Sequence, residues 1–275
     1  MKMIEPIDLL RKKAYQIRSQ ILTMVFNAQS GHIGGSLSAV DVLVSLYYHL
    51  MNHDPARPDW ELRDRFILSK GHCTPVIYSI LADCGYFPTD DLRTFRRPGS
   101  HLQGHPYAPK TPGIEASTGT LGLGLSTACG MALAAKLKRE SQKYYVLCGD
   151  GETQEGQIWE AAMFANKYRL HNLITIIDRN YLQTDGHSEQ IMPLEPFAAK
   201  WEAFGWEVFE IDGHDYSEII STFKDAKQAA RPVVIIAHTT KGKGVPFMEG
   251  DYIWHGKPPD QNEYKTAMDT LYEIK

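Results

Sequence analysis

The sequence predicts an α/β fold in which a parallel sheet carries helices on both faces. Short apolar runs typical of buried strands recur along the chain, and amphipathic patterns with helical spacing lie between them. This alternation extends over about 240 residues, and units of this kind join parallel strands through right-handed crossovers. We therefore expect a single domain over residues 1–275.

The first part of the chain predicts three helices and one strand. Residues 8–28 place apolar side chains at helical spacing among charges, and the stretch from Met1 to Asn27 has no unbroken apolar run of the kind expected in a signal peptide. Residues 39–51 and 74–85 show the same amphipathic spacing. Between these two helices the short apolar run "RFILS", residues 65–69, predicts a strand.

The middle of the chain predicts two helices and two buried strands. A helix is expected over residues 125–138 and another over 155–169. The apolar runs "YYVLC", residues 144–148, and "LITIID", residues 173–178, are too short for helices and predict fully buried strands.

The last part predicts two strands around a helix and then a loop-rich segment. "EVFEI", residues 207–211, and "PVVIIAHT", residues 232–239, predict strands, with a helix over 216–228 between them. Gly and Pro then break the pattern over residues 240–275, and long loops of this kind are often functional. A short helix over 262–273 is expected within that segment.

The bulk composition excludes several classes of partner. Lys and Arg total 29 against 33 Asp and Glu, so the net charge of −4 gives no general attraction to nucleic acid or to anionic membranes. No window approaches the roughly 20 apolar residues of a membrane span. The four cysteines form no C-x-x-C pair and are expected to be reduced thiols, which favours a cytoplasmic location.

Polar loops that contain glycine or a basic residue follow four of the predicted strands. "KGH", "GDG", "RNYLQTDG" and "TKGKG" come after the strands at 65–69, 144–148, 173–178 and 232–239. Ligands of parallel sheets bind outside the carboxyl ends of the strands, where such loops gather. The chemistry is therefore expected at that edge.

An acid stands between two glycines, Gly149-Asp150-Gly151, where a strand gives way to a helix. A helix start suits a phosphate, but a carboxylate there would repel it unless a divalent cation such as Mg²⁺ or Ca²⁺ lay between them. Asn180, after the next strand, offers an amide oxygen, and Leu182 a backbone carbonyl. Alone, Asp150 could simply cap the helix and Asn180 make a turn. Their separation of about 30 residues, one helix plus one strand, favours the metal site.

A GDG motif followed about 30 residues later by Asn, each after an apolar strand, resembles the diphosphate-binding motif of thiamine-diphosphate enzymes. Five further segments resemble, in the same order, the N-terminal half of transketolase: "SGHIGGSLS" (30–38), "SKGH" (69–72), "LQGHP" (102–106), "TGTLGLGLSTACGMALA" (118–134) and "WHGKPP" (254–259). The resemblance covers nearly the whole chain. It implies the thiamine-diphosphate-binding fold, in its diphosphate-binding domain. Thiamine diphosphate and Mg²⁺ (or Ca²⁺) are the implied cofactors, with Asp150, Asn180 and the Leu182 carbonyl on the metal.

The resemblance also implies four active-site histidines: His32, His72, His105 and His255. In the family the first three surround the donor sugar and the reacting carbon, and the last lies near the diphosphate and the substrate channel. Cleaving a ketose beside its carbonyl requires proton transfers near neutral pH, for which imidazole is suited. His105, in "GHP", matches the family better than His101. An ordinary packed or solvated role is expected for histidines 49, 53, 171, 187 and 214.

The cofactor contacts implied by the resemblance are Gly119, Leu121, Gly149, Asp150, Gly151, Glu155, Asn180 and His255. The backbone around Gly119 would touch the cofactor rings, with Leu121 as an apolar contact. Glu155 matches a glutamate at a subunit interface between two cofactor sites, although the helix dipole alone favours an acid there. Many transketolases have Pro and Gln where this chain has Thr120 and Leu123, a difference that bears on substrate preference.

In the family, a glutamate on a second domain activates the cofactor, and no segment up to Lys275 matches that domain. The resemblance therefore implies the N-terminal subunit of a split transketolase, whose separate C-terminal subunit carries the pyrimidine-binding domain. Two copies of each chain are expected. The pair would move a two-carbon ketol unit from a ketose (phosphate) donor to an aldose (phosphate) acceptor.

Two alternatives remain open at this point. The chain could be a 1-deoxyxylulose-5-phosphate synthase-like subunit, which also has "KGKG" followed by a "WH" segment and would use pyruvate as donor. It could also be a non-catalytic cofactor-binding subunit, against which the complete set of histidines argues.

Overall fold

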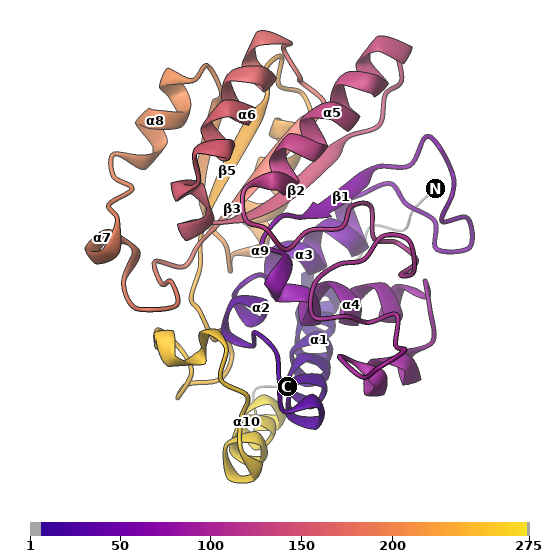
Figure 1. Cartoon of the computed structure of the whole chain (residues 1–275), viewed down its shortest axis with the longest axis vertical. Coiled ribbons are helices and arrows are strands. Elements are labelled where there is room, and N and C mark those ends of the chain that lie inside the picture. The colour runs from indigo at the N-terminus through magenta and orange to yellow at the C-terminus, as the bar shows by residue number, and fades with distance from the viewer. Residues whose placement is uncertain (1–6, 274–275) are drawn as a thin grey trace.

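The computed structural model describes residues 7–273 and builds them around one five-stranded sheet (Figure 1). All of the strands are parallel, and their order across the sheet is β1-β2-β3-β5-β4. They are β1 (Arg65–Leu68), β2 (Tyr144–Gly149), β3 (Leu173–Arg179), β4 (Glu207–Asp212) and β5 (Val233–His238). The predicted parallel α/β fold is confirmed.

Helices and short helical turns connect the strands. The longer helices are α1 (Ile7–Ala28), α4 (Thr74–Cys84), α5 (Leu123–Lys138), α6 (Gly156–Lys167), α9 (Tyr216–Ala226) and α10 (Gln261–Glu273). The shorter ones are α2 (Gly34–Ser38), α3 (Val40–Ser45), α7 (Ser188–Ile191) and α8 (Phe197–Ala203). Tight or wide turns form η1 (Leu46–Leu50), η2 (Gly71–Cys73), η3 (Thr89–Thr94), η4 (Gly151–Gln154) and η5 (Tyr252–His255). Within residues 7–273, no helix combines the length and apolar character needed to cross a membrane.

The sheet separates two apolar clusters because successive side chains of a strand point to opposite faces. On β2, Tyr145 and Leu147 pack into a cluster formed with α1, α3, α4 and α9. Val146 and Cys148, between and beyond them, pack into the other cluster with α5, α6 and α8. Both faces are therefore covered, as expected for an all-parallel sheet (Figure 1).

Two predicted helices differ in the structure. The helix expected over residues 155–169 begins only at Gly156, because Glu155 adopts an extended backbone (φ −70°, ψ 130°) and separates α6 from the turn η4. The helix expected over 39–51 is α3 followed by the wider π turn η1. That turn closes with the Met51 amide donating to the Leu46 carbonyl.

Candidate active site

The register of the sheet brings the predicted loops together. Gly149 pairs with Asp178 across β2 and β3, and Asp178 pairs with Ala237 across β3 and β5. The chain therefore leaves three neighbouring strands at one edge. A cavity of about 350 Å³ opens there. Its lining includes every predicted site residue except one: His32, His72, Gly119, Leu121, Gly149, Asp150, Gly151, Glu155, Asn180, Leu182 and His255.

His105, the exception, lies directly beside this cavity. A Cβ added to Gly119 would lie 3.4 Å from the His105 ring, an ordinary van der Waals distance, so the ring sits directly beside the backbone of this loop. His101 points elsewhere, with its ring against Phe87 and its Nε2 3.1 Å from an Asp91 carboxylate oxygen.

Asp150 is buried and held by donors from several segments. Its Oδ1 accepts a hydrogen bond from the Gly151 amide (2.8 Å). Its Oδ2 accepts from the Tyr181 amide (2.8 Å), from Arg179 Nη1 (3.1 Å) and from Ser188 Oγ (3.3 Å). Burial raises the pKa of Asp150, while Arg179 opposes that rise. Oδ1, with one donor, keeps room for a further electropositive partner.

The other oxygen donors lie on the adjoining loop. Asn180 Nδ2 donates to Asp178 (2.8 Å), which leaves Asn180 Oδ1 to accept from the Leu182 amide (3.1 Å). The Leu182 carbonyl accepts from Lys241 Nζ (2.8 Å). One carboxylate, one amide and one carbonyl form a set of hard oxygen atoms that could hold Mg²⁺ or Ca²⁺. Among residues 7–273, no group of three or more His, Cys, Asp or Glu has the geometry of a metal centre.

Asp178 is the buried anchor beneath these loops. It pairs with Lys70 Nζ, accepts from the hydroxyl groups of Thr239 and Ser38, and accepts from Asn180. Burial alone would raise the pKa of Asp178, but Lys70 and the hydroxyl donors outweigh it and lower the pKa. The carboxylate is therefore ionised and fully occupied, so its role is to orient Asn180.

Three of the predicted histidines form a cluster. The ring centroids lie 5.0 Å apart for His32 and His72, 5.3 Å for His32 and His255, and 5.1 Å for His72 and His255. Burial, together with neighbouring positive charges, lowers the pKa of His32 to about 4 and that of His255 to about 3. The same causes lower the pKa of His72. All three rings are therefore neutral near pH 7 and can accept protons.

Lys241 lies among these groups and was not predicted from the sequence. Besides the Leu182 carbonyl, its Nζ lies 3.0 Å from His255 Nδ1. Burial and the nearby Lys70 lower the pKa of Lys241 to about 8. The only signal in the sequence was its place in "TKGKG", directly after a buried strand.

Glu152 is a second residue that sequence reasoning missed. Its Oε1 accepts from Ser69 Oγ (2.5 Å) and from the Gly122 amide (2.9 Å), and its Oε2 accepts from the Gly149 amide (2.9 Å). One buried carboxylate thus ties together the loop after β1, the glycine-rich loop before α5 and the end of β2. Glu155, by contrast, is exposed and makes no capping hydrogen bond at the start of α6.

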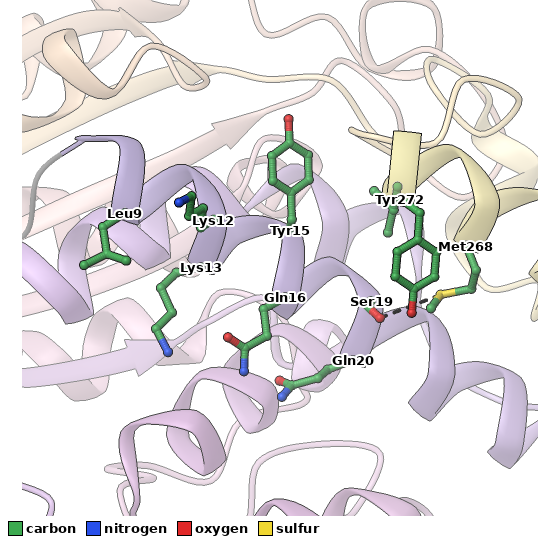
Figure 2. Close-up of a pocket in the computed structure, with 10 residues that line it drawn as sticks. Leu9, Lys12, Lys13, Tyr15, Gln16, Ser19, Gln20, Met268 and Tyr272 are labelled. Carbon is green, nitrogen blue, oxygen red and sulfur yellow. Dashed lines mark hydrogen bonds between the residues drawn. The ribbon is translucent and has the colours of Figure 1, made fainter. Parts of the chain in front are cut away.

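A separate groove of about 400 Å³ runs between α1 and α10 (Figure 2). Its walls are side chains of these two helices, among them Leu9, Tyr15 and Tyr272. Ser19 and Met268 meet across it, with 3.8 Å between Oγ and Sδ. None of the predicted site residues lines this groove, so the chemistry is assigned to the cavity at the strand ends.

Comparison with known proteins gives one consistent family. Residues 10–272 match the family described as transketolase, thiamine diphosphate binding domain. The chain is 46% identical to one subunit of the 6-deoxy-6-sulfo-D-fructose transketolase of Clostridium sp. (strain MSTE9), covering 95% of this chain and 96% of that one. It is 44% identical to one subunit of the apulose-4-phosphate transketolase of Phocaeicola vulgatus, covering 97% and 95%.

Longer transketolases match over part of their length. The crystal structure of transketolase from Campylobacter jejuni superposes with a TM-score of 0.92 at 37% identity, covering 98% of this chain and 43% of that one. Human transketolase is 36% identical, again over 98% of this chain and 43% of its own length.

Proposed function

The chain belongs to the transketolase family, through its thiamine diphosphate-binding domain, and on that premise we propose that it is the N-terminal subunit of a two-chain transketolase. The observation that carries the proposal is the gathering of the histidines and the oxygen donors at one cavity. The span of the match supports it further, because the chain covers 96% of one relative named as a subunit but 43% of transketolases made as one chain.

We propose that this single diphosphate-binding domain holds thiamine diphosphate and a divalent cation, Mg²⁺ or Ca²⁺. Asp150, Asn180 and the Leu182 carbonyl would bind the cation. The Gly151 amide would donate to a diphosphate oxygen, and Gly119 with Leu121 would contact the cofactor rings. When bound, the cofactor supplies the electron sink for cleaving the bond beside a ketose carbonyl.

The proposed reaction moves a two-carbon ketol unit from a ketose (phosphate) to an aldose (phosphate). His32, His72, His105 and His255 would accept and return protons of the sugar hydroxyl groups, for which their neutral rings are suited. Two relatives are named for a sulfonated and a phosphorylated sugar, which supports a substrate with an anionic end.

We propose that the second chain carries the pyrimidine-binding domain and that two copies of each chain assemble. The names of the relatives, which describe subunits, support a partner chain. Glu155, exposed beside the cavity, would lie at an interface between subunits in that assembly. A cytoplasmic location is supported by the four cysteines, which are free thiols in the structure.

The proposal is tested by ketol transfer with the chain alone and with its copurified partner. We expect transfer only from the complex, and none with pyruvate as donor. Substantial activity of the chain alone would overturn the two-chain proposal.

The metal assignment has its own test, which does not depend on turnover. Asp150→Ala and Asn180→Ala should weaken metal-dependent binding of thiamine diphosphate to the complex, measured by calorimetry. Asp185→Ala, which removes an exposed acid from the same loop, is the control and should bind normally. Normal binding by both site variants would remove the assignment.

A further inference from the structure

Arg96 joins two loops that each carry one of the predicted active-site histidines. Its Nη1 donates to Ser30 Oγ (2.8 Å), two residues before His32. Its guanidinium also packs on Gly104, one residue before His105, where an added Cβ would lie 2.8 Å from the Arg96 Cζ. Glycine is therefore required at 104 for the guanidinium to sit there.

The backbone of Arg96 is shaped for this placement. Arg96 has φ +59°, in the left-handed region that residues other than glycine seldom adopt. Its amide donates to the Leu102 carbonyl (2.8 Å), which folds the histidine-bearing loop back over it. A strained backbone that is held by its surroundings is a recurrent feature of functional sites.

The charge of Arg96 is not neutralised within residues 7–273. No carboxylate lies within ion-pair distance of its guanidinium there, and its buried Nε has no hydrogen-bond partner. Its other neighbours are aromatic, namely the Phe95 ring 5.5 Å away and the Tyr78 phenol. The positive charge therefore acts directly on the titratable side chains around it.

The nearby titratable groups are the Tyr78 phenol and the two histidines, and the histidines are the ones that titrate near neutral pH. Burial is the largest cause that lowers the pKa of His32, and Arg96 is the next, followed by His105 and Lys241. The rings of His72 and His255 also face His32. For His105, burial and then Arg96 lower the pKa.

We propose that Arg96 is a positioning residue for ketol transfer, which fixes the His32 and His105 loops relative to each other and places a positive charge beside both rings. This inference rests on the proposed function for its catalytic meaning. The effect of Arg96 on the histidine rings involves only side chains of this subunit, so it can be measured without turnover.

The test compares complexes of the two subunits that carry Arg96→Gln, Arg96→Lys or the control Arg97→Gln, which changes the exposed neighbouring arginine. Histidine titration is followed by NMR with labelled imidazoles, and kcat/KM is measured against pH. Arg96→Gln should raise the pKa of His32 and His105 by about one pH unit, because a nearby positive charge is lost. The acidic limb of kcat/KM should shift upward with it.

Arg96→Lys should separate charge from geometry. It keeps the charge, so the acidic limb should stay near that of the wild type, but it loses the planar fork that spans the two loops. We expect kcat to fall by roughly 10- to 100-fold, the scale of a misplacement of about 1 Å. Arg97→Gln should match the wild type.

Loss of activity in Arg96→Gln without any change in histidine titration would overturn the electrostatic role, and wild-type behaviour of both Arg96 variants would overturn the whole inference. If the wild-type complex showed no ketol transfer, the proposed function would fail. The NMR titration would then still decide whether Arg96 controls the two rings. If Arg96→Gln did not fold, Ser30→Ala would replace it, with a fall in kcat expected and an unmoved kcat overturning the link between the loops.

Discussion

Replacing Glu152 by Gln tests how much of the site is held by one carboxylate. The substitution keeps the size of the side chain but removes its charge and turns one oxygen into a donor group. A glutamine oxygen can still accept from Ser69 and Gly122, but its NH₂ group then faces the Gly149 amide, so two donors meet. Turning the amide over restores the bond from the Gly149 amide and lets Ser69 Oγ accept instead of donate, but the NH₂ group then faces the Gly122 amide, so two donors meet there.

The cost follows from the hydrogen bonds that are lost. A bond to a buried charged group contributes about 1.5–3 kcal/mol, and a donor left without a partner adds to that, so we expect Glu152→Gln to cost about 2–4 kcal/mol. At roughly 2–4 °C per kcal/mol for a domain of this size class, the unfolding temperature should fall by about 4–16 °C. Affinity for thiamine diphosphate should fall as well, because the three tied loops line the cavity.

The assay is thermal unfolding of the chain followed by circular dichroism, with Glu160→Gln as the matched control. Glu160 is an exposed residue of α6, so the same chemical change there should leave the unfolding temperature nearly unchanged. If Glu152→Gln shifted the temperature no more than the control does, the carboxylate would not be what holds these loops.

Two further predictions concern the framework of the site, and a third concerns the buried Arg18–Asp41 pair. Gly124→Ala should be destabilising by about 1–3 kcal/mol, because its Cβ would lie 2.7 Å from the Ser69 Cα. Gly130→Ala in the same helix meets nothing within 4 Å and should be neutral or stabilising by up to about 1 kcal/mol. Urea unfolding compares the two variants, and equal changes in stability would contradict the packing argument. Lys70→Met should lower the free energy of unfolding by about 3–5 kcal/mol, because it leaves the Asp178 carboxylate buried without its cation. Adding Asp178→Asn to that variant should recover part of the lost stability. An unchanged stability of Lys70→Met in the same urea assay would refute this. Burial would raise the pKa of Asp41, but Arg18 and His214 hold it below its usual range, so its stabilisation is present above about pH 4 and is lost as the pH falls further. Acid unfolding should therefore be steeper in the wild type than in Asp41→Asn, and parallel curves would count against this assignment.

The sequence was informative wherever the signal was local or followed from a strand-helix-strand unit. Apolar runs located the five strands of the described residues: β1, β2, β3 and β5 are largely buried and so carry apolar side chains on both faces, whereas the edge strand β4 is only partly buried. The separation between Asp150 and Asn180 anticipated their proximity, since consecutive parallel strands commonly lie side by side, as β2 and β3 do here. The functional roles of these residues stay predictions.

The site residues that were not predicted owe their roles to contacts between segments far apart in the sequence. Glu152 meets Ser69 and Gly122, which are 83 and 30 residues away, and no periodicity marks such a residue. Arg96 stands in an ordinary polar loop, and its importance appears only once Ser30 and Gly104 are placed around it. The break before α6 likewise lies at a single residue, Glu155, whose extended backbone no periodicity of the sequence marks.

The position of β5 between β3 and β4 has a consequence for how the protein is made. The ribosome completes β4 before β5, and the roughly 20 residues between them take about 1–4 s to translate at about 5–20 residues per second. During that interval the nascent chain holds β4 with no neighbour in the sheet and leaves an edge of β3 open, and unpaired strand edges of this kind favour aggregation. Thr239, Lys241 and His255 are translated only after β5, so the pocket at the strand ends is assembled among the last events of synthesis.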